Sequence, residues 1–327
     1  MDHKDYSRKE FIKLSSLTGA GLAFTAGLPF LKENKPVMAN KIDPAEPIID
    51  IHQHTNYLGR TDDELLAHQY NMGVTTTILL PAGHPVEYGS TYYGVGNGLQ
   101  AEATPNEACY KLANELPKEF LFGANEVPDL PGAIQEIEKY LKLGAPVIGE
   151  SKFGLDCDSP EMQKIYELAQ EYNVPVHQHW LFNMYNRGLE RFHKMLEKYP
   201  KVNFIGHAQT WWANVDKDLK TQNMMYPVGK VTPGGLTDRL LSDYPNMYGD
   251  LAAPSGLNFF LRDEDHARGF LDRHQDKLVF GSDCTDKLGH GPSCAGAMII
   301  AAVRRTSSSK IVERKLLFEN AKKLLRL

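Results

Sequence analysis

The chain has 327 residues, of which 42% are hydrophobic, with 36 basic and 41 acidic side chains. This composition is typical of a globular protein with a large core, and it excludes a disordered or fibrous chain. No apolar run is long and pure enough to cross a bilayer, since spanning takes about 20 residues. The best candidate, Leu14–Phe30, is interrupted by Gly, Ser and Thr. The length permits one large α/β barrel or two smaller domains.

The first 39 residues have the three-part build of an export signal. A charged patch at Tyr6–Lys13 precedes the weakly apolar Leu14–Phe30, and Pro36–Ala39 offers small residues for a cleavage after Ala39. The patch is similar to a twin-arginine signal, with Lys9 in place of the second arginine. We therefore predict an exported, periplasmic bacterial protein. The alternative is an uncleaved amphipathic arm.

Cleavage after Ala39 would remove 6 basic and 4 acidic residues and leave a net charge of −7. Nucleic-acid-binding proteins neutralise phosphates with basic patches, and this chain has no run of Lys and Arg. We therefore expect a small-molecule substrate, no nucleic-acid partner and no stable membrane insertion. The sequence leaves open whether the chain forms a homo-oligomer. The four cysteines form no Cys-x-x-Cys pair, which favours buried free thiols over a zinc knuckle.

Eight short β-type runs are spread along the rest of the chain. Each is apolar and largely β-branched or aromatic, as expected for buried parallel strands. The predicted strands are Pro47–His54, Val74–Pro81, Phe120–Val127, Pro146–Ser151, Val174–Trp180, Lys201–His207, Met247–Ala252 and Lys277–Asp283.

Helical patterns fill the gaps between these strands. Thr61 followed by three acidic residues predicts a helix start, and Gly73 predicts its end. The further predicted helices are Pro131–Gly144, Pro160–Asn173, Gly188–Tyr199, Gly235–Tyr244, Glu264–Arg273, Ala295–Val303 and Val312–Leu325.

Strict alternation of strands and helices predicts a single (β/α)8 TIM barrel over residues 40–327. The rival is an open doubly wound sheet, but no Gly-x-Gly-x-x-Gly turn follows the first strand. The longest irregular insert, Gln209–Gly234, follows the sixth strand and is interpreted as an active-site lid.

Histidine and carboxylate residues gather at the carboxyl ends of five predicted strands, where barrel active sites are built. Because side chains alternate along a strand, His52 and His54 share one face of the first strand. Imidazoles and carboxylates that converge with an open position are typical of a catalytic divalent-metal site. The residues at these ends are His52, His54, Glu150, Lys152, His177, His179, His207 and Asp283.

The pattern of these residues resembles the amidohydrolase-related metal-dependent hydrolases. The resemblance runs from about Pro47 to the C-terminus and includes the closing helix Lys315–Leu325. It is specific for the superfamily and not for a substrate. The residues that carry it are Asp50-x-His52-x-His54, Pro175-Val176-x-x-His179, Gly206-His207 and Phe280-Gly281-Ser282-Asp283.

The resemblance implies a role for each ligand. His52, His54 and Asp283 would hold the more buried metal, and His179 and His207 would bind a second metal or assist the first. Glu150 would bridge two metals, a position where deoxyribonucleases of the TatD type also carry a glutamate. The family spacing selects His179 as the ligand on the fifth strand and leaves His177 one layer deeper. The expected cofactor is therefore one or two divalent ions, with zinc as the first choice.

A hydrolytic mechanism follows from this ligand set. A bound divalent ion activates water near neutral pH, and Asp283 would take the proton from that water and pass it to the leaving group. Lys152 or His207 would stabilise the developing oxyanion. The predicted reaction is hydrolysis of a small-molecule amide, lactone or ester.

Other residues near the strand ends are candidates for substrate binding. His84 and His290 follow the second and eighth strands, and Trp180 and Trp211 flank ligand residues. Arg262 would clamp a substrate carboxylate, or pair with the acidic residues that follow it in the sequence.

Two other functions remain as alternatives to the hydrolase. The resembling family contains barrels that use the same ligands for non-oxidative decarboxylation of aromatic or unsaturated carboxylic acids. A binding protein without catalysis is the third reading, and the complete ligand set argues against it.

Overall fold

The computed structural model describes residues 43, 45–92, 94–96 and 103–327. The predicted export segment, residues 1–39, lies outside these ranges. Within them, each strand is paired in parallel with its neighbours in the sheet. The strands are β1 (Ile49–Gln53), β2 (Thr76–Leu79), β3 (Phe120–Phe122), β4 (Ile148–Ser151), β5 (Val176–His179), β6 (Phe204–His207), β7 (Met247–Asp250) and β8 (Leu278–Val279).

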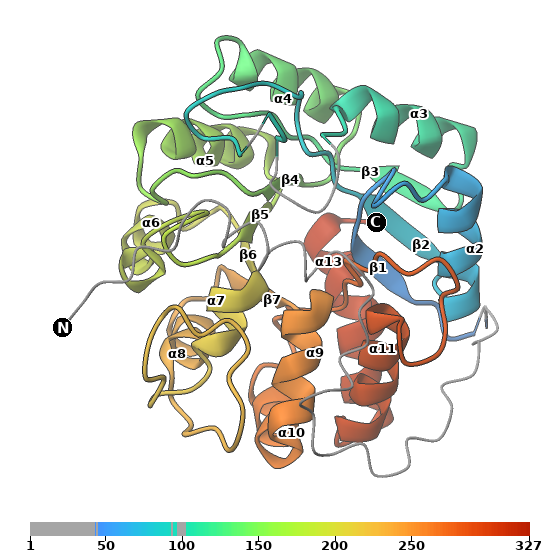
Figure 1. Cartoon of the computed structure of the whole chain (residues 1–327), viewed down its shortest axis with the longest axis vertical. Coiled ribbons are helices and arrows are strands. Elements are labelled where there is room, and N and C mark those ends of the chain that lie inside the picture. Colours follow the sequence, from blue (N-terminus) through green and yellow to red (C-terminus); the bar gives the residue numbers. More distant parts are fainter. Residues whose placement is uncertain (1–42, 44, 93, 97–102) are drawn as a thin grey trace, which may run out of the picture.

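Helices follow the strands along the chain and surround them in space (Figure 1). A short 3₁₀ segment, η1 (Leu189–Arg191), precedes α6, and a π-helical segment, η2 (Lys315–Glu319), lies between the last two α-helices. The α-helices are α2 (Asp62–Met72), α3 (Asn106–Glu115), α4 (Ala133–Lys142), α5 (Pro160–Tyr172), α6 (His193–Lys198), α7 (Ala208–Ala213), α8 (Leu236–Asp243), α9 (Ala253–Arg262), α10 (Glu264–Arg273), α11 (Ala295–Thr306), α12 (Lys310–Arg314) and α13 (Asn320–Leu325).

The strands form two hydrogen-bonded runs, β1–β2–β3 and β4–β5–β6–β7–β8, and sparse contacts join the runs at both ends. A parallel bridge between Ala124 and Ile148 connects the segment after β3 to β4. At the other junction, the backbone N–H of Ile51 donates to the carbonyl of Phe280 over 3.1 Å. These contacts close the sheet, and the predicted α/β barrel is confirmed.

Local sequence signals explain where the helices begin and end. Thr61 and Glu64 form a reciprocal capping box at the start of α2, and Gly73 ends it with a φ of 81°, a left-handed conformation that suits glycine. Ser159 caps α5 ahead of Pro160, and Asn173 ends that helix in the left-handed region. The helix starting at Thr61 and the helix over Pro160–Asn173 are therefore where the sequence predicts them.

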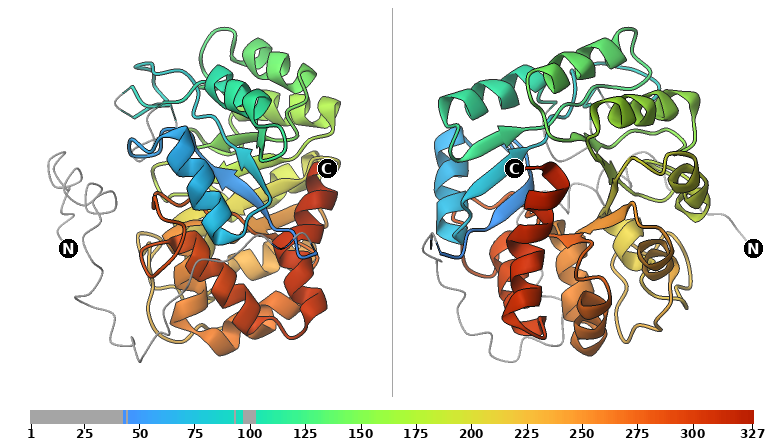
Figure 2. Two further views of the ribbon diagram at one scale, coloured as in Figure 1. Left: turned by 90° about the vertical axis from the view of Figure 1, so that its right-hand side faces the viewer. Right: turned by 180° about the vertical axis from the view of Figure 1, so that it is seen from behind.

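Two hydrophobic layers hold the barrel together. The larger layer lies between the strands and the surrounding helices. The smaller one fills the barrel and includes Ile49, Ile51 and Ile205 from the strands, with Leu324 and Leu325 of α13 packed against them. The C-terminal segment is drawn in red against the central strands in the right-hand view of Figure 2. The polar candidate site therefore has an apolar layer beneath it.

The structure corrects several predicted elements. The strands are shorter than predicted; β8, for example, covers Leu278–Val279 rather than Lys277–Asp283. Helices α3, α7 and α9 were not predicted, and α7 occupies the start of the insert interpreted as an irregular lid. Pro254 and Gly256 in α9 weaken its helical signal, although proline is well tolerated in a first turn.

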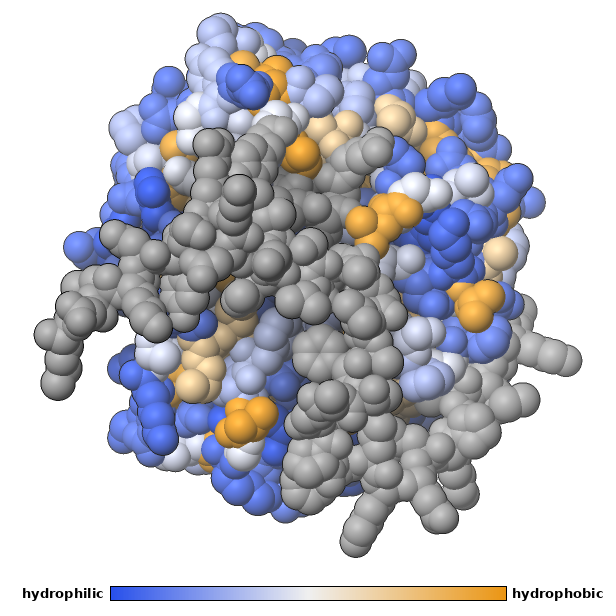
Figure 3. Space-filling view, viewed as in Figure 1, coloured by the Kyte–Doolittle hydropathy of each residue, from blue (hydrophilic) through white to orange (hydrophobic). Residues whose placement is uncertain are grey.

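No helix in the described part of the chain combines the length and apolarity that a bilayer crossing needs. Figure 3 shows a mostly hydrophilic face on which hydrophobic residues lie in small separate groups. Single exposed hydrophobic residues such as Val228 and Ile311 are usual on globular proteins.

Asp238 of α8 is expected to contribute stability that depends on pH. Burial alone would raise its pKa, but contacts to His274 (2.6 Å) and Arg273 (3.0 Å) lower it from 3.8 to about 2. The unfolded chain therefore binds more protons between those values, and the contribution is lost as the pH falls from about 4 to about 2. Asp238→Asn should cost about 1–2 kcal/mol near neutral pH and about half as much near pH 3, measured by urea unfolding.

Asp243, an exposed carboxylate on the same helix, provides the control for this measurement. Asp243→Asn should change the unfolding free energy by less than about 0.5 kcal/mol at either pH. A cost for Asp238→Asn that is the same at both pH values would contradict the assignment.

Candidate metal centre

His52 and His54 at the end of β1 direct their Nε2 atoms at each other. The Nδ1–H of His52 donates to Asp250 Oδ2 over 2.8 Å, and the Nδ1–H of His54 donates to the carbonyl of Leu80 over 2.8 Å. The Nε2 atom of each ring is then the one left to bind a proton or a metal ion. The two Nε2 atoms are 3.2 Å apart, so a single proton or a single ion can be shared between them.

A shift in strand register separates these histidines from Asp50. The pairing of β1 with β2 is irregular between Asp50 and Gln53. Asp50 accepts hydrogen bonds from Gln69 of α2 and from the backbone and hydroxyl of Ser282, so it does not join the histidine cluster. Such irregularities re-aim side chains and are frequent beside active sites.

Glu150 and Asp283 complete the surroundings of this histidine pair. Glu150 Oε2 lies 3.6 Å from His52 Nε2 and 3.4 Å from His54 Nε2. Asp283 Oδ1 lies 3.8 and 3.7 Å from the same two nitrogens. Both carboxylates are buried, so they form a closed set of oxygen and nitrogen donors with the two imidazoles.

The other oxygen of Glu150 faces a second pair of histidines. His179 Nδ1 is 2.6 Å from Glu150 Oε1, and His207 Nε2 is 3.8 Å from the same atom. In-register pairing of β5 with β6 places His179 directly opposite His207. The predicted ligands therefore form two groups, each compact enough to hold one ion: His52, His54 and Asp283, and Glu150, His179 and His207.

Asp250, at the end of β7, was not predicted. Its Oδ2 atom lies 2.8 Å from His52 Nδ1, 2.9 Å from His177 Nε2 and 3.2 Å from His207 Nδ1. The side chain is fully buried. The position of His177 one layer deeper than His179 fits this contact. Because Asp250 lies near the end of the predicted strand Met247–Ala252, the rule that selected the other ligands applies to it as well.

Glycine at position 281 allows β1 and β7 to approach each other at this point. A Cβ atom there would overlap Asp250 Oδ1 and lie 2.8 Å from the Cβ of His52. Asp283, two residues later, has a φ of 40°, a conformation that is uncommon for residues other than glycine and frequent at functional sites.

The charges in the cluster require a cation. Burial would raise the pKa of Glu150 and of Asp283. The largest opposing effect in both cases is the charge of His52, which helps to lower both pKa values well below normal. Burial opposes protonation of His52, yet Asp283 and Glu150 raise its pKa well above its usual value. Burial also lowers the pKa of His179 to about 3, which leaves it neutral. The two ionised, buried carboxylates therefore favour positive charge in the cluster, carried by His52 or by a bound ion.

Unsatisfied polar atoms support the same conclusion. Among the described residues, His179 Nε2, His207 Nε2 and Asp283 Oδ1 are buried and have no hydrogen-bond partner. Leaving such atoms unsatisfied costs about 1–3 kcal/mol each. The donor set therefore fits a divalent ion that binds nitrogen and oxygen.

Two tyrosines, Tyr57 and Tyr185, flank the cluster. Burial and the Asp283 and Glu150 carboxylates raise the pKa of Tyr57 well above normal, so it stays a neutral phenol. The Tyr185 ring lies 5.7 Å from that of His179, and its buried hydroxyl has no partner among the described atoms. Sequence reasoning missed both tyrosines because each lies in a loop after a strand.

Lys152, which the sequence predicted as a stabiliser of negative charge, lies beside these residues. Its ammonium nitrogen is 5.8 Å from the centre of the Tyr185 ring, and the side chain is only 7% exposed. Burial is the main cause of the lowered pKa of His179, and the positive charge of Lys152 lowers it further. No carboxylate in the described ranges pairs with Lys152, so this buried cation is free to meet an anionic group of a ligand.

The predicted tryptophans lie in the hydrophobic layer. Trp180 is 1% exposed and packs edge-to-face on Phe192, with the ring centres 4.8 Å apart. Trp211 is fully buried beside Gly206 and Gly249, where it fills the space that side chains would occupy. These positions give both residues a packing role in the barrel wall.

The remaining substrate-binding candidates lie in loops around the strand ends. His84 contacts the buried carboxylate of Glu126, and about half of its side chain is exposed. Arg262 pairs with Asp216 over 2.8 Å and donates to the carbonyl of Gly229, so it secures the loop after α7 rather than pairing with its acidic neighbours. His290 is half-buried in the loop after β8.

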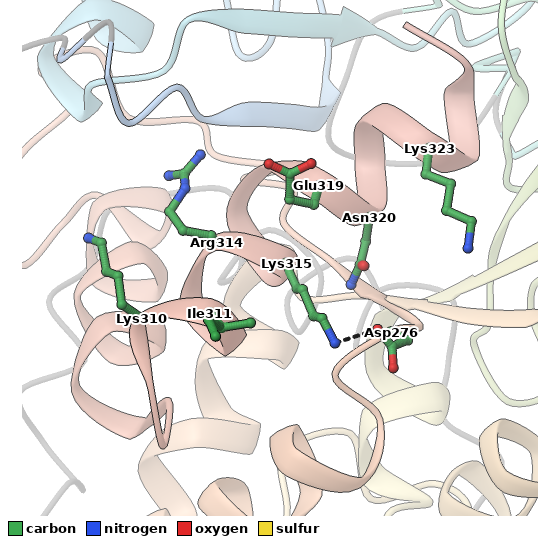
Figure 4. Close-up of a pocket in the computed structure, with 8 residues that line it drawn as sticks. All are labelled: Asp276, Lys310, Ile311, Arg314, Lys315, Glu319, Asn320 and Lys323. Atoms are coloured by element: carbon green, nitrogen blue, oxygen red, sulfur yellow. Dashed lines mark ion pairs between the residues drawn. The ribbon is translucent and has the colours of Figure 1, made fainter.

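A pocket of about 480 Å³ lies near the amino ends of β1 and β8, away from the metal cluster (Figure 4). Asn320 donates to the carbonyl of Leu278 there, and Lys315 pairs with Asp276 over 2.8 Å. No histidine lines this pocket, so its chemistry differs from that of the strand-end cluster. It is lined by Asp276, Lys310, Ile311, Arg314, Lys315, Glu319, Asn320 and Lys323.

Comparisons with solved structures identify the same architecture. A 2,6-dihydroxybenzoate decarboxylase from Rhizobium is 12% identical, covers 86% of this chain and 99% of its own, and has a TM-score of 0.54. An uncharacterised TIM-barrel protein from Bordetella bronchiseptica is 12% identical over 86% and 98% of the chains, with a TM-score of 0.58. The chain shares the fold of these barrels.

A third similar structure belongs to a protein with a different reaction. A probable 2-pyrone-4,6-dicarboxylic acid hydrolase from Acinetobacter baumannii, with citric acid bound, is 14% identical over 86% of this chain and 99% of its own, with a TM-score of 0.55. No protein-family model and no curated protein matches the sequence.

Asn in place of Asp250 is expected to weaken metal binding without removing a ligand. An amide oxygen accepts from the imidazole N–H groups less strongly than a carboxylate, and the amide N–H₂ group forces one ring into the other tautomer. Loss of such an orienting partner typically costs 10–100-fold in metal affinity, so this range is expected for Asp250→Asn in titrations against a competing chelator. Unchanged affinity in a folded variant would show that Asp250 does not orient the ligands.

Proposed function

We propose that the protein is a metal-dependent hydrolase of a small-molecule ester, lactone or amide, related to the amidohydrolase superfamily. The observation that carries the proposal is the pair of His52 and His54 Nε2 atoms, 3.2 Å apart and enclosed by two buried carboxylates. That separation suits two imidazole ligands of one ion, to which the carboxylates would add further donors.

Two ions fit the donors better than one. Glu150 directs Oε2 at the His52–His54 pair and Oε1 at the His179–His207 pair, which suits a bridging carboxylate. Zinc is the ion we propose, because imidazole and carboxylate donors in a site with an open position are typical of catalytic zinc.

The residues around the ions can divide the work of hydrolysis between them. A divalent ion at this site acts as a Lewis acid and provides a nucleophile from water near neutral pH. The Asp283 carboxylate, held ionised and in contact with His207 Nε2 (3.5 Å), would accept a proton and deliver it to the leaving group. Lys152 would stabilise negative charge that develops on the substrate, because it is buried and has no described carboxylate partner.

Non-oxidative decarboxylation is the second candidate function. Lys152 favours it in one respect, since an unpaired buried ammonium group also suits a substrate carboxylate. The shared fold with a 2,6-dihydroxybenzoate decarboxylase is compatible with this reading. At 12% identity, however, the similarity is evidence for a common fold only.

The experiment that tests the proposal follows the fate of water and of carbon dioxide. The zinc-loaded full chain is incubated with panels of lactones, esters, amides and aromatic carboxylic acids in ¹⁸O-labelled water. Hydrolysis places one ¹⁸O atom in the product, whereas decarboxylation releases carbon dioxide and leaves the other product unlabelled. Turnover with label incorporation, lost when the metal is removed, supports the hydrolase. Metal-dependent carbon dioxide release supports the alternative.

A further inference from the structure

A second cluster of metal-binding side chains lies beside the candidate centre. Cys294 Sγ is 3.7 Å from Cys284 Sγ and 3.5 Å from His68 Nε2. His68 belongs to α2, whereas both cysteines belong to the segment that follows β8, and all three side chains are buried. One donor atom from each lies close enough to the others to share an ion.

The distances match tetrahedral coordination. With Zn–S bonds of about 2.3 Å and Zn–N bonds of about 2.0 Å, two sulfur ligands lie about 3.8 Å apart and a sulfur lies about 3.5 Å from a nitrogen. The observed separations, 3.7 and 3.5 Å, are close to both values. A disulfide would instead need the sulfurs at about 2.0 Å. All four cysteines of the chain are free thiols in the structure.

Contacts outside the cluster hold its members in place. The carbonyl of Cys284 accepts hydrogen bonds from Gln53 (3.0 Å) and Arg60 (2.8 Å). Asn71 of α2 donates to the carbonyl of Leu288 over 2.8 Å and so fastens the loop between the cysteines to the helix that carries His68. The donor atoms are therefore preorganised by groups that take no part in the cluster.

The imidazole of His68 points its Nε2 at the sulfurs. Nε2 lies 3.5 Å from Cys294 Sγ, whereas Nδ1 is buried and has no partner among the described residues. The ring is therefore held from its Nε2 side, where the two thiols lie.

We propose that His68, Cys284 and Cys294 form a second metal site that takes Zn²⁺. Thiolate and imidazole donors favour zinc and other soft ions over calcium or magnesium. Two thiolates and one divalent ion sum to zero charge, which suits a buried position where a net charge is costly. Because Cys284 directly follows Asp283, an ion bound here anchors the backbone next to that carboxylate. The proposal does not depend on the reaction catalysed at the barrel mouth.

Cobalt spectroscopy of the full chain tests this site. Co²⁺ is added to reduced, metal-free protein, and the near-ultraviolet sulfur-to-cobalt charge-transfer band is recorded. The barrel-mouth ligands contain no sulfur, so the band reports on the cysteine cluster alone. At saturating Co²⁺ we expect the band of one thiolate-bound ion per chain, and excess Zn²⁺ should abolish it. The band should persist in His52→Ala/His54→Ala and disappear in Cys284→Ser/Cys294→Ser.

The other two buried cysteines provide the matched control. Cys109→Ser/Cys157→Ser should retain the full band, because neither residue belongs to the cluster. A wild-type chain that gives no charge-transfer band overturns the proposal without reference to any variant. The proposal also fails if the band survives in a folded Cys284→Ser/Cys294→Ser variant. A Cys284–Cys294 disulfide in protein purified without reductant overturns it when the reduced form takes up no Co²⁺.

Discussion

The double substitution His52→Ala/His54→Ala is expected to remove at least one equivalent of divalent ion per chain from the barrel mouth. Both Nε2 atoms lie within 3.8 Å of Glu150 and Asp283, so the substitution deletes two of the donors that surround a single point. The carboxylates that remain are a poor zinc site, because catalytic zinc usually has three protein ligands that include histidine. Elemental analysis of the purified chain measures the loss.

Two comparisons make this result specific. His193→Ala, on the partly exposed start of α6 and outside both metal-binding groups, should keep the full metal content. Glu150→Gln should lower the barrel-mouth content, taken as the total less any ion bound by the cysteine cluster, from two equivalents toward one if the carboxylate bridges. Wild-type protein that binds no zinc at this site after reconstitution would refute both the metal centre and the proposed reaction.

Asn in place of Asp283 should produce the largest loss of turnover. General acid–base catalysis contributes about 10²–10⁴-fold, so we expect a fall of that size in kcat for whichever substrate the label experiment identifies. An amide is nearly the same size as the carboxylate but has no basic oxygen for a proton. The assay is run with saturating zinc, so that weaker binding of the ion does not contribute.

The control for this variant is Asp156→Asn. Asp156 lies in the loop after β4, is half-exposed and pairs with Arg187. Its kcat should stay within about twofold of the wild type. If Asp283→Asn turns over normally at full metal occupancy, Asp283 is a ligand or a spectator and another group accepts the proton.

Much of the barrel could be predicted because its signals are local. The apolar runs and the caps at Thr61, Gly73 and Ser159 indicate their elements without reference to the rest of the chain. The unpredicted α7 and α9 begin directly after their strands and carry residues with weak helical preference. Packing against each other and against the barrel stabilises these helices, and such support does not appear in a local pattern.

The geometry of parallel strands made the metal cluster predictable, and it also explains which parts of the cluster could not be predicted. Carboxyl ends of parallel strands meet at one rim, so His52 and Asp283 come together although they are 231 positions apart in the chain. Alternation along β5 also indicates that Trp180, next to His179, points away from the site. The sequence does not reveal the irregular register that turns Asp50 outward, because it depends on pairing with β2.

The contact of one Asp250 oxygen with three imidazoles has a consequence for how this protein can diverge. That oxygen fixes which nitrogen of His52 stays basic and lies 3.2 Å from His207 Nδ1, although Asp250 itself belongs to a different strand. A relative could therefore change its preferred ion, or lose the ion altogether, while every ligand residue remains unchanged. Ligand motifs alone would then misclassify such a relative. The residue at the end of the seventh strand would distinguish barrels that bind the metal ion from barrels that have lost it.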